Sequence, residues 1–247
     1  MEFLVFRLYA PLAAWGRVAV GQERPSDPYP SKSAIVGLLA AALGIRREEE
    51  AALAALAEGY GCALCIDQEG ALLRDYHTAQ VPSRVALKGR PLLTRRDELA
   101  PARADLNTIL SFREYRCDAL ARVALWARSG APQPLAALAA ALRRPRFALY
   151  LGRKSCPPAL PLCAQCLDAA TLEAAFAAAR FPDEWLDEAG PFDPASTPLL
   201  CWELDAPTAL AAQMTVLRRD QPRSRRRWQF GERSEAQARM AGPGASS

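Results

Sequence analysis

The order in which strand-like and helix-like segments follow one another restricts the fold of this chain most strongly. Residues 2–9 (EFLVFRLY) carry aromatic and branched side chains over the length of a strand, and Pro11 ends that run because proline cannot donate to a strand ladder. A helix is predicted next, since Ser31 or Ser33 can cap it, Gly44 can end it, and apolar residues recur with helical spacing at Ile35, Leu38, Leu39, Ala42 and Leu43. The chain therefore begins with a strand and a helix that has one buried stripe.

The same order continues and then repeats beyond a polar insertion. A helix (48–59), a strand (60–67) and an arginine-rich insertion (70–114) are predicted next. A strand (119–126), a helix (134–142) and another strand (147–151) are predicted after the insertion. Two βαβ units around an insertion give the βαββαβ order of a ferredoxin-like fold, whose sheet also serves RNA-recognition (RRM-like) domains. The predicted fold class is therefore α+β.

The last third of the chain is predicted to form a smaller, mainly β unit. A helix is expected at 169–179, followed by strand-like stretches at 199–204, 214–217 and 228–230. The chain is predicted to divide into a ferredoxin-like RNA-binding domain (1–165), a small β unit (166–235) and a disordered tail (236–247) that ends in AGPGASS.

Composition excludes several classes of protein. The 247 residues are 51% hydrophobic and 23% charged, which is typical of a globular chain and unlike a disordered one. The longest apolar run, 35–45, is shorter than the ~18 residues that a membrane span needs. Glu2 precedes the first apolar residues and Arg7 lies among them, which is not the charge order of a signal peptide. Seven cysteines, an odd number, then predict reduced thiols in a cytoplasmic protein.

Positive charge is concentrated, although the net charge is only +4. Residues 143–154 carry five cations and no acid, residues 218–227 carry six arginines and one aspartate, and the insertion carries a third cluster at 84–96. The charge clusters alone favour a solvated surface and a binding site equally. Aromatic residues lie beside these cations: Tyr76, Tyr115, Tyr150 and Trp228. Single-stranded RNA is held by cationic grooves with stacking rings, so the pattern favours RNA, although any single ring is more often part of a core.

Two short segments have the composition of an anion site. Residues 151–155 (LGRKS) place a flexible backbone, two cations and a hydroxyl at the end of a predicted strand, where they can meet a phosphate. The spacing of the GxxxxGK[ST] loop is missing, so nucleotide hydrolysis is not predicted. Residues 31–33 (SKS) offer hydroxyls, a cation and helix amides, but ordinary helix capping explains them more simply and is favoured.

Metal binding and catalysis find little support in the residues. Cys62 and Cys65 form one CxxC pair and 163–166 contain a second, a spacing that can bind zinc. The first pair lies in a predicted strand, where residues three apart face opposite sides, so buried thiols are favoured. The only histidine, His77, can act as a general acid or base beside Tyr76, but a packing or hydrogen-bonding role is favoured. No metal, cofactor or catalytic residue is predicted.

Several segments, in order and at matching spacing, resemble the CasD subunit family of type I-E CRISPR Cascade complexes, within the RAMP superfamily. They are RLYAPLAAWG (7–16), PSKSAIVGLL (30–39), LGI (43–45), RDYHT (74–78), REYRCDA (113–119), YLGRKSCP (150–157), RDQP (219–222) and RWQF (227–230). The resemblance extends to about residue 162 and resumes at 218–233, whereas 163–215 do not match clearly.

The resemblance implies a non-catalytic ribonucleoprotein subunit that serves antiviral defence. Such a subunit binds the 5′ handle of the CRISPR guide RNA and caps the backbone filament, in contact with the CasC backbone subunit and the large CasA subunit. Target DNA joins the assembled complex and is read by base pairing, whereas the single-stranded handle is open to stacking and base-edge hydrogen bonds. The inserted stretch, about 80–112, would be a thumb between the guide and the adjoining CasC subunit.

Residue by residue, the resemblance implies an RNA-binding set. Its members are Trp15, Ser31, Lys32, Ser33, Arg74, Tyr76, His77, Arg113, Tyr115, Arg116, Arg153, Lys154, Ser155, Arg226 and Arg227. A different class of function comes from related proteins that cleave CRISPR repeat RNA without metal. In such an endoribonuclease, Tyr76 and His77 with Lys32 or Lys154 would act as base, acid and transition-state stabiliser.

Overall fold

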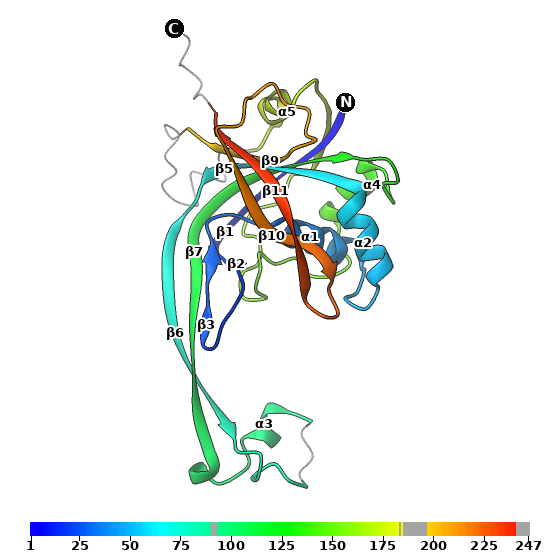
Figure 1. The fold of residues 1–247 in the computed structure, drawn as a ribbon. Coiled ribbons are helices and arrows are strands. Elements are labelled where there is room, and N and C mark those ends of the chain that lie inside the picture. Colours follow the sequence, from blue (N-terminus) through cyan, green and yellow to red (C-terminus); the bar gives the residue numbers. More distant parts are fainter. Residues whose placement is uncertain (90–92, 183, 185–196, 241–247) are drawn as a thin grey trace.

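The computed structural model describes residues 1–89, 93–182, 184 and 197–240, which form a large sheet with few helices (Figure 1). The strands are β1 (Glu2–Ala13), β2 (Trp15–Gly16), β3 (Glu23–Arg24), β4 (Ser26–Asp27), β5 (Tyr60–Gln68), β6 (Ala71–Pro82), β7 (Leu106–Ala127), β8 (Gln165–Asp168), β9 (Leu199–Glu203), β10 (Met214–Ser224) and β11 (Gln229–Arg239). The helices are α1 (Lys32–Leu43), α2 (Glu50–Gly59), α3 (Arg95–Glu98), α4 (Leu135–Arg143), α5 (Leu172–Ala178) and the 3₁₀ helix η1 (Arg103–Asp105). The predicted α+β class is confirmed. None of the helices in these ranges is long and apolar enough to cross a membrane.

The main sheet is almost entirely antiparallel. In the described ranges it has nine strands, with the order β10-β11-β9-β5-β7-β1-β8, and β3 and β6 pair with β7 beside this path. β1 lies between β7 and β8 and is antiparallel to both, and β5 pairs with the other edge of β7. The chain order β1, α1, β5, β7, α4, β8 reproduces the predicted alternation of strands and helices.

The predicted strand at 147–151 is wrong, because its backbone bonds lie outside the sheet. The amide of Phe147 donates to the carbonyl of Ala41 at the end of α1, at 3.1 Å. The carbonyl of Leu151 accepts from Ala14, and the amide of Leu151 donates to Cys156, at 3.0 and 2.7 Å. The strand position beside β1 belongs instead to β8, which pairs with Glu2 to Val5.

The two faces of the sheet carry separate cores because side chains alternate along a strand. In β1, Leu4, Phe6 and Leu8 pack with α1, α2 and α4 on one face. Phe3 and Val5 pack on the other face with α5. The predicted helix cap is also confirmed, since Gly44 ends α1 in the left-handed conformation at φ 81°.

A two-stranded arm leaves the body of the molecule (Figure 1). It consists of β6 and the first half of β7, paired from Ala71 opposite Cys117 to Pro82 opposite Leu106, with α3 and η1 at its tip. The stretch at 70–114 showed little periodicity because most side chains of these strands are exposed or half-buried, so no apolar alternation marks them. The stretch expected to be a thumb, 80–112, lies in this arm, and residues 90–92 lie outside the described residues.

The C-terminal strands extend the same sheet. β9 pairs with β5 on one side and with β11 on the other, and the predicted helix at 169–179 is present as α5. The expected boundary between residues 165 and 166 falls within β8, and the division into two domains stays a prediction. The predicted tail begins too early, because β11 continues to Arg239 and buries Ala236 and Ala238 against β9. Residues 241–247 and 185–196 lie outside the described residues.

Candidate nucleic-acid interface

A groove of about 1060 Å³ opens beside α1. Four separate segments border it: the chain around β2, the start of α1, the loop 150–153 and the β10–β11 hairpin. Six arginines and two aspartates line it: Arg17, Arg24, Arg153, Arg218, Arg219, Arg225, Asp27 and Asp220. The groove therefore gathers more positive than negative charge from distant parts of the sequence.

Among the described residues, two of the six arginines have a carboxylate partner. Arg17 lies 3.1 Å from Asp27, and Arg218 lies 3.4 Å from the same carboxylate. The other four, within the part of the chain described, form no ion pair: Arg24, Arg153, Arg219 and Arg225. Such guanidinium groups are suited to neutralise phosphates.

Aromatic rings lie between these cations. Trp15, Tyr150, Trp228 and Phe230 line the same groove. Trp15 is 5% exposed and its amide donates to the hydroxyl of Ser26 at 2.9 Å, whereas its buried indole Nε1 has no hydrogen-bond partner in the described ranges. Tyr150 and Trp228 are exposed. The groove thus combines rings with arginines that lack a carboxylate partner among the described residues, although Arg24, Arg153 and Arg225 donate to backbone carbonyls. Single-strand binding sites combine the same two kinds of side chain.

The start of α1 is an ordinary capped helix. The hydroxyl of Ser31 accepts from the amide of Ala34 at 3.1 Å and lies 2.9 Å from the hydroxyl of Ser33. The amide of Lys32 donates to Asp220 at 2.8 Å. The favoured capping interpretation is confirmed, and a carboxylate of the chain already occupies the helix start.

The prediction that the Lys32 side chain contacts RNA is wrong. This side chain is 3% exposed, and its Nζ lies 2.6 Å from Oε1 of Glu203. Arg128 approaches the other oxygen of Glu203 at 2.5 Å. Lys32 is therefore part of the buried contact between α1 and β9, because a lysine at this helix position points towards the sheet.

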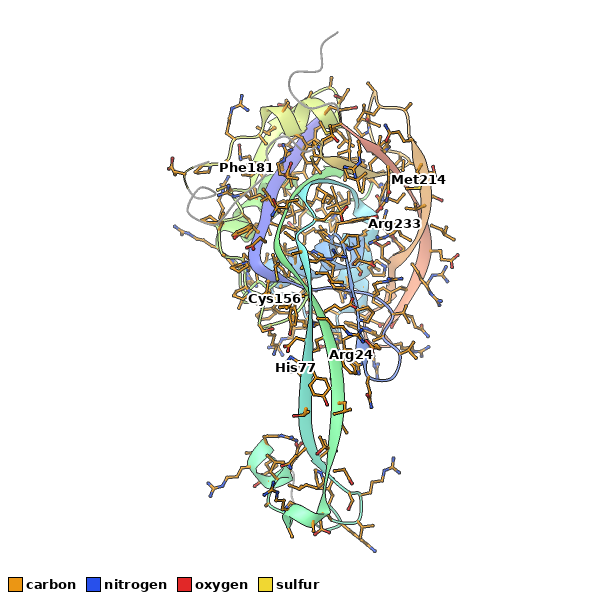
Figure 2. All side chains as sticks on the ribbon, turned by 90° about the vertical axis from the view of Figure 1, so that its left-hand side faces the viewer. Arg24, His77, Cys156, Phe181, Met214 and Arg233 are labelled. Carbon is orange, nitrogen blue, oxygen red and sulfur yellow. The ribbon has the colours of Figure 1, made fainter. Side chains whose placement is uncertain are left out.

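A second group of predicted residues lies on the arm, away from the groove lining. These are Arg74, Tyr76, His77 and Arg113, of which Figure 2 labels His77. Arg74 pairs with Glu23 at 2.8 Å, and the ring of Tyr76 lies 5.3 Å from that of Phe112. These side chains cover the base of the arm, and their contact with RNA stays a prediction.

The remaining predicted residues have different surroundings. Tyr115 is only 6% exposed, so its ring is not a free stacking surface, and the guanidinium of Arg153 lies 4.5 Å from the ring centre. Arg116 is half-buried on β7, whereas the exposed members lie outside the groove lining: Lys154, Ser155, Arg226 and Arg227. Of the predicted set, the groove brings together Trp15, Ser31, Ser33 and Arg153.

Several groove residues were missing from the predicted set. Arg219 and Arg225 belong to the basic cluster at 218–227, and Tyr150 and Trp228 are aromatic neighbours of such clusters, so local signals existed for these four. No sequence pattern marks Arg17 and Arg24, which only the packing of the β2 segment brings into the groove. The third basic cluster, at 84–96 in the insertion, includes residue 90, which lies outside the described residues.

The cysteine pair in β5 faces opposite sides, as predicted. Cys62 packs in the core beneath α1 and Cys65 in the core beneath α5, and burial raises the pKa of each thiol to about 12. All seven cysteines are free. Across the described ranges, no three His, Cys, Asp or Glu residues lie close enough to hold a metal ion.

Known proteins match both the sequence and the fold. Residues 3–234 match the family described as CRISPR-associated protein (Cas_Cas5). The CRISPR system Cascade subunit CasD of Escherichia coli (strain K12) is 35% identical over 169 residues, which cover 65% of this chain and 69% of that protein. A solved CRISPR RNA-guided surveillance complex contains a chain that is 25% identical, with a TM-score of 0.62 over 99% of this chain and 95% of that one. A Cas protein crystal structure is 26% identical, with a TM-score of 0.58 over 97% and 95%.

The family match and the fold matches each span nearly the whole chain. This chain belongs to the CRISPR-associated protein (Cas_Cas5) family.

Proposed function

We propose that this chain is a non-catalytic, RNA-binding subunit of a cytoplasmic CRISPR Cascade surveillance complex, and that the groove beside α1 holds single-stranded guide RNA. The observation that carries the proposal is the set of four unpaired arginines among aromatic rings in one groove. Support also comes from the relatives, which are a Cascade subunit and a chain of an RNA-guided surveillance complex.

The RNA segment in the groove is the 5′ handle of the guide. The handle is single-stranded, so its bases are free to stack on rings while its phosphates meet arginines. The body that holds it has the ferredoxin-like arrangement. The support is the chain order β1, α1, β5, β7, α4, β8, together with the position of β7 and β1 in the middle of the four neighbouring strands β5-β7-β1-β8.

The arm serves as the thumb of the subunit. It reaches beyond the body, where it can lie between the guide and an adjoining CasC-like backbone subunit (Figure 1). The subunit thereby caps one end of the filament and contacts a CasA-like large subunit, and target DNA joins the assembled complex by pairing with the guide.

The endoribonuclease alternative has weaker support. One of its two candidate lysines, Lys32, is buried against Glu203 and is not available to a transition state. Tyr76 and His77 lie on the arm rather than in the groove. The alternative predicts defined cleavage of repeat RNA without metal, which the binding experiment below also detects.

The experiment measures binding of the full chain, alone and with the CasC-like subunit, to RNA with the intact or a scrambled handle over a range of salt concentrations. Arg219→Gln removes an unpaired groove cation, and Arg144→Gln removes an exposed arginine outside the groove lining. We expect preference for the intact handle and uncut RNA. The salt slope, which is the magnitude of the slope of the logarithm of the binding constant against the logarithm of the salt concentration, should be lower by about 0.7 in Arg219→Gln only. Equal weak binding to both RNAs, or equal slopes in the two variants, contradicts the proposal.

A further inference from the structure

The turn between β10 and β11 presents a tryptophan at the rim of the groove. Trp228 is 58% exposed, and its backbone has a φ of 56°, in the left-handed region. A bulky residue rarely adopts this strained conformation, which persists where the surroundings or a function retain it. The turn therefore displays a large ring to solvent at a cost in backbone energy.

Two guanidinium groups lie near this ring without a counterion. Arg47, from the connection between α1 and α2, lies 4.7 Å from the ring centre, and Arg225 lies 5.7 Å from it. Neither forms an ion pair with a carboxylate of the described residues. The acid nearby, Glu50, accepts instead from the hydroxyl of Ser224 and the amide of Arg226. Two like charges near one ring are stabilised when an anion lies between them.

Burial makes this arrangement costlier for Arg225. Burial, followed by the charge of Arg47, lowers the pKa of the Arg225 guanidinium. The Arg225 guanidinium donates to the backbone carbonyl of Ser33, which joins the turn to the start of α1. The turn is thus continuous with the groove, whose lining includes Arg225, Trp228 and Phe230.

We propose that Trp228, Arg47 and Arg225 form a subsite for one nucleotide, in which the base stacks on the exposed part of the indole and the phosphate lies between the two guanidiniums. This inference rests on the proposed function of the groove, because it extends the same RNA-binding surface. The Phe230 ring lies 5.7 Å from the indole and nearly perpendicular to it, at 83°, and packs against it. Stacking on an indole is available to every base, so the subsite accepts any nucleotide.

Two variants of Trp228 separate stacking from folding. Trp228→Asn places a residue that tolerates the left-handed conformation in the turn, so we expect thermal stability equal to or above that of the native chain. Its affinity for the handle RNA should fall about tenfold, with the salt slope unchanged. Trp228→Phe keeps a ring and should recover part of the affinity. Loss of affinity that follows loss of stability in both variants overturns the proposal.

A variant and a matched control test the phosphate contact. Arg47→Gln should lower the salt slope by about 0.7, whereas Arg46→Gln, the exposed neighbouring arginine, should leave it unchanged. RNA should also quench tryptophan fluorescence in the native chain and do so less in Trp228→Phe.

The outcomes distinguish this inference from the proposed function. If Arg219→Gln weakens handle binding while Trp228→Asn and Arg47→Gln bind as the native chain does, the subsite is overturned and the groove function stands. If the native chain shows no handle preference, both fail. If the Trp228 and Arg47 variants bind RNA as the native chain does but assemble more weakly onto the CasC-like subunit, the turn belongs to a protein interface and the subsite is overturned.

Discussion

Replacing Lys32 with methionine tests whether the start of α1 carries a buried charge pair. The Lys32 side chain is 3% exposed and its Nζ lies 2.6 Å from Oε1 of Glu203. Removing one partner of a buried pair leaves the other charge uncompensated, which costs about 3–5 kcal/mol. Arg128 still lies 2.5 Å from the other oxygen of Glu203, so we expect the lower end, about 3 kcal/mol.

The assay is thermal unfolding of the full chain, followed by RNA binding at a temperature where both variants are folded. For a chain of this size, 1 kcal/mol shifts Tm by about 2–4 °C, so Lys32→Met should lower Tm by about 6–12 °C. Lys154→Met makes the same substitution at an exposed position and should change stability by less than about 0.5 kcal/mol. Folded Lys32→Met should keep the salt slope of RNA binding.

A double variant checks the cause of the destabilisation. Glu203→Gln removes the charge that Lys32→Met leaves behind, so the combined variant should be less destabilised than the sum of the single ones, with a coupling of about 0.5–3 kcal/mol. If Lys32→Met instead unfolds at the native Tm and loses about 0.7 of the salt slope, Lys32 faces the RNA and the reasoning is refuted.

Three further predictions follow from single contacts. Gly152→Ala should destabilise the chain by about 1–3 kcal/mol or more and weaken handle binding, since φ is 88° and the new Cβ would collide with the carbonyl of Ala14; unaltered Tm and affinity would contradict this. The Tyr9 hydroxyl donates to Asp118 at 3.1 Å, and burial and this bond raise the pKa of Tyr9 to about 12. The stability that depends on protonated Tyr9 is therefore complete below about pH 10 and is lost as the pH rises to 12, so urea unfolding at pH 9–12 should show a smaller alkaline loss in Tyr9→Phe. Ellman's reagent should react with native protein only at cysteines outside the buried set, and rapid modification of all seven thiols would refute the assigned burial of Cys62, Cys65, Cys156 and Cys201.

Much of the body could be predicted because its signals are local. The nearly continuous apolar runs of β1 and β5 indicate strands that are buried on both faces, and the helical stripe of α1 indicates its buried side. The cap residues Ser31 and Gly44 mark the ends of that helix. The arm could not be predicted as strands, since side chains that are open to solvent on both faces need no apolar pattern. The short β8 was missed for a related reason: its place beside β1 depends on long-range pairing, not on its four residues.

The sequence by itself determined the alternation of strands and helices, the likeness to a CRISPR subunit family, and the presence of cationic clusters beside aromatic residues. Only the tertiary structure decided which cations are free. Lys32 belongs to the predicted RNA-binding set and Arg225 to the basic cluster at 218–227, yet Lys32 is buried against Glu203, whereas Arg225 lines the groove and has no carboxylate partner among the described residues. The physical reason is that the pairing of a charge depends on residues far away in the chain that folding brings beside it, and a local pattern carries no information about them.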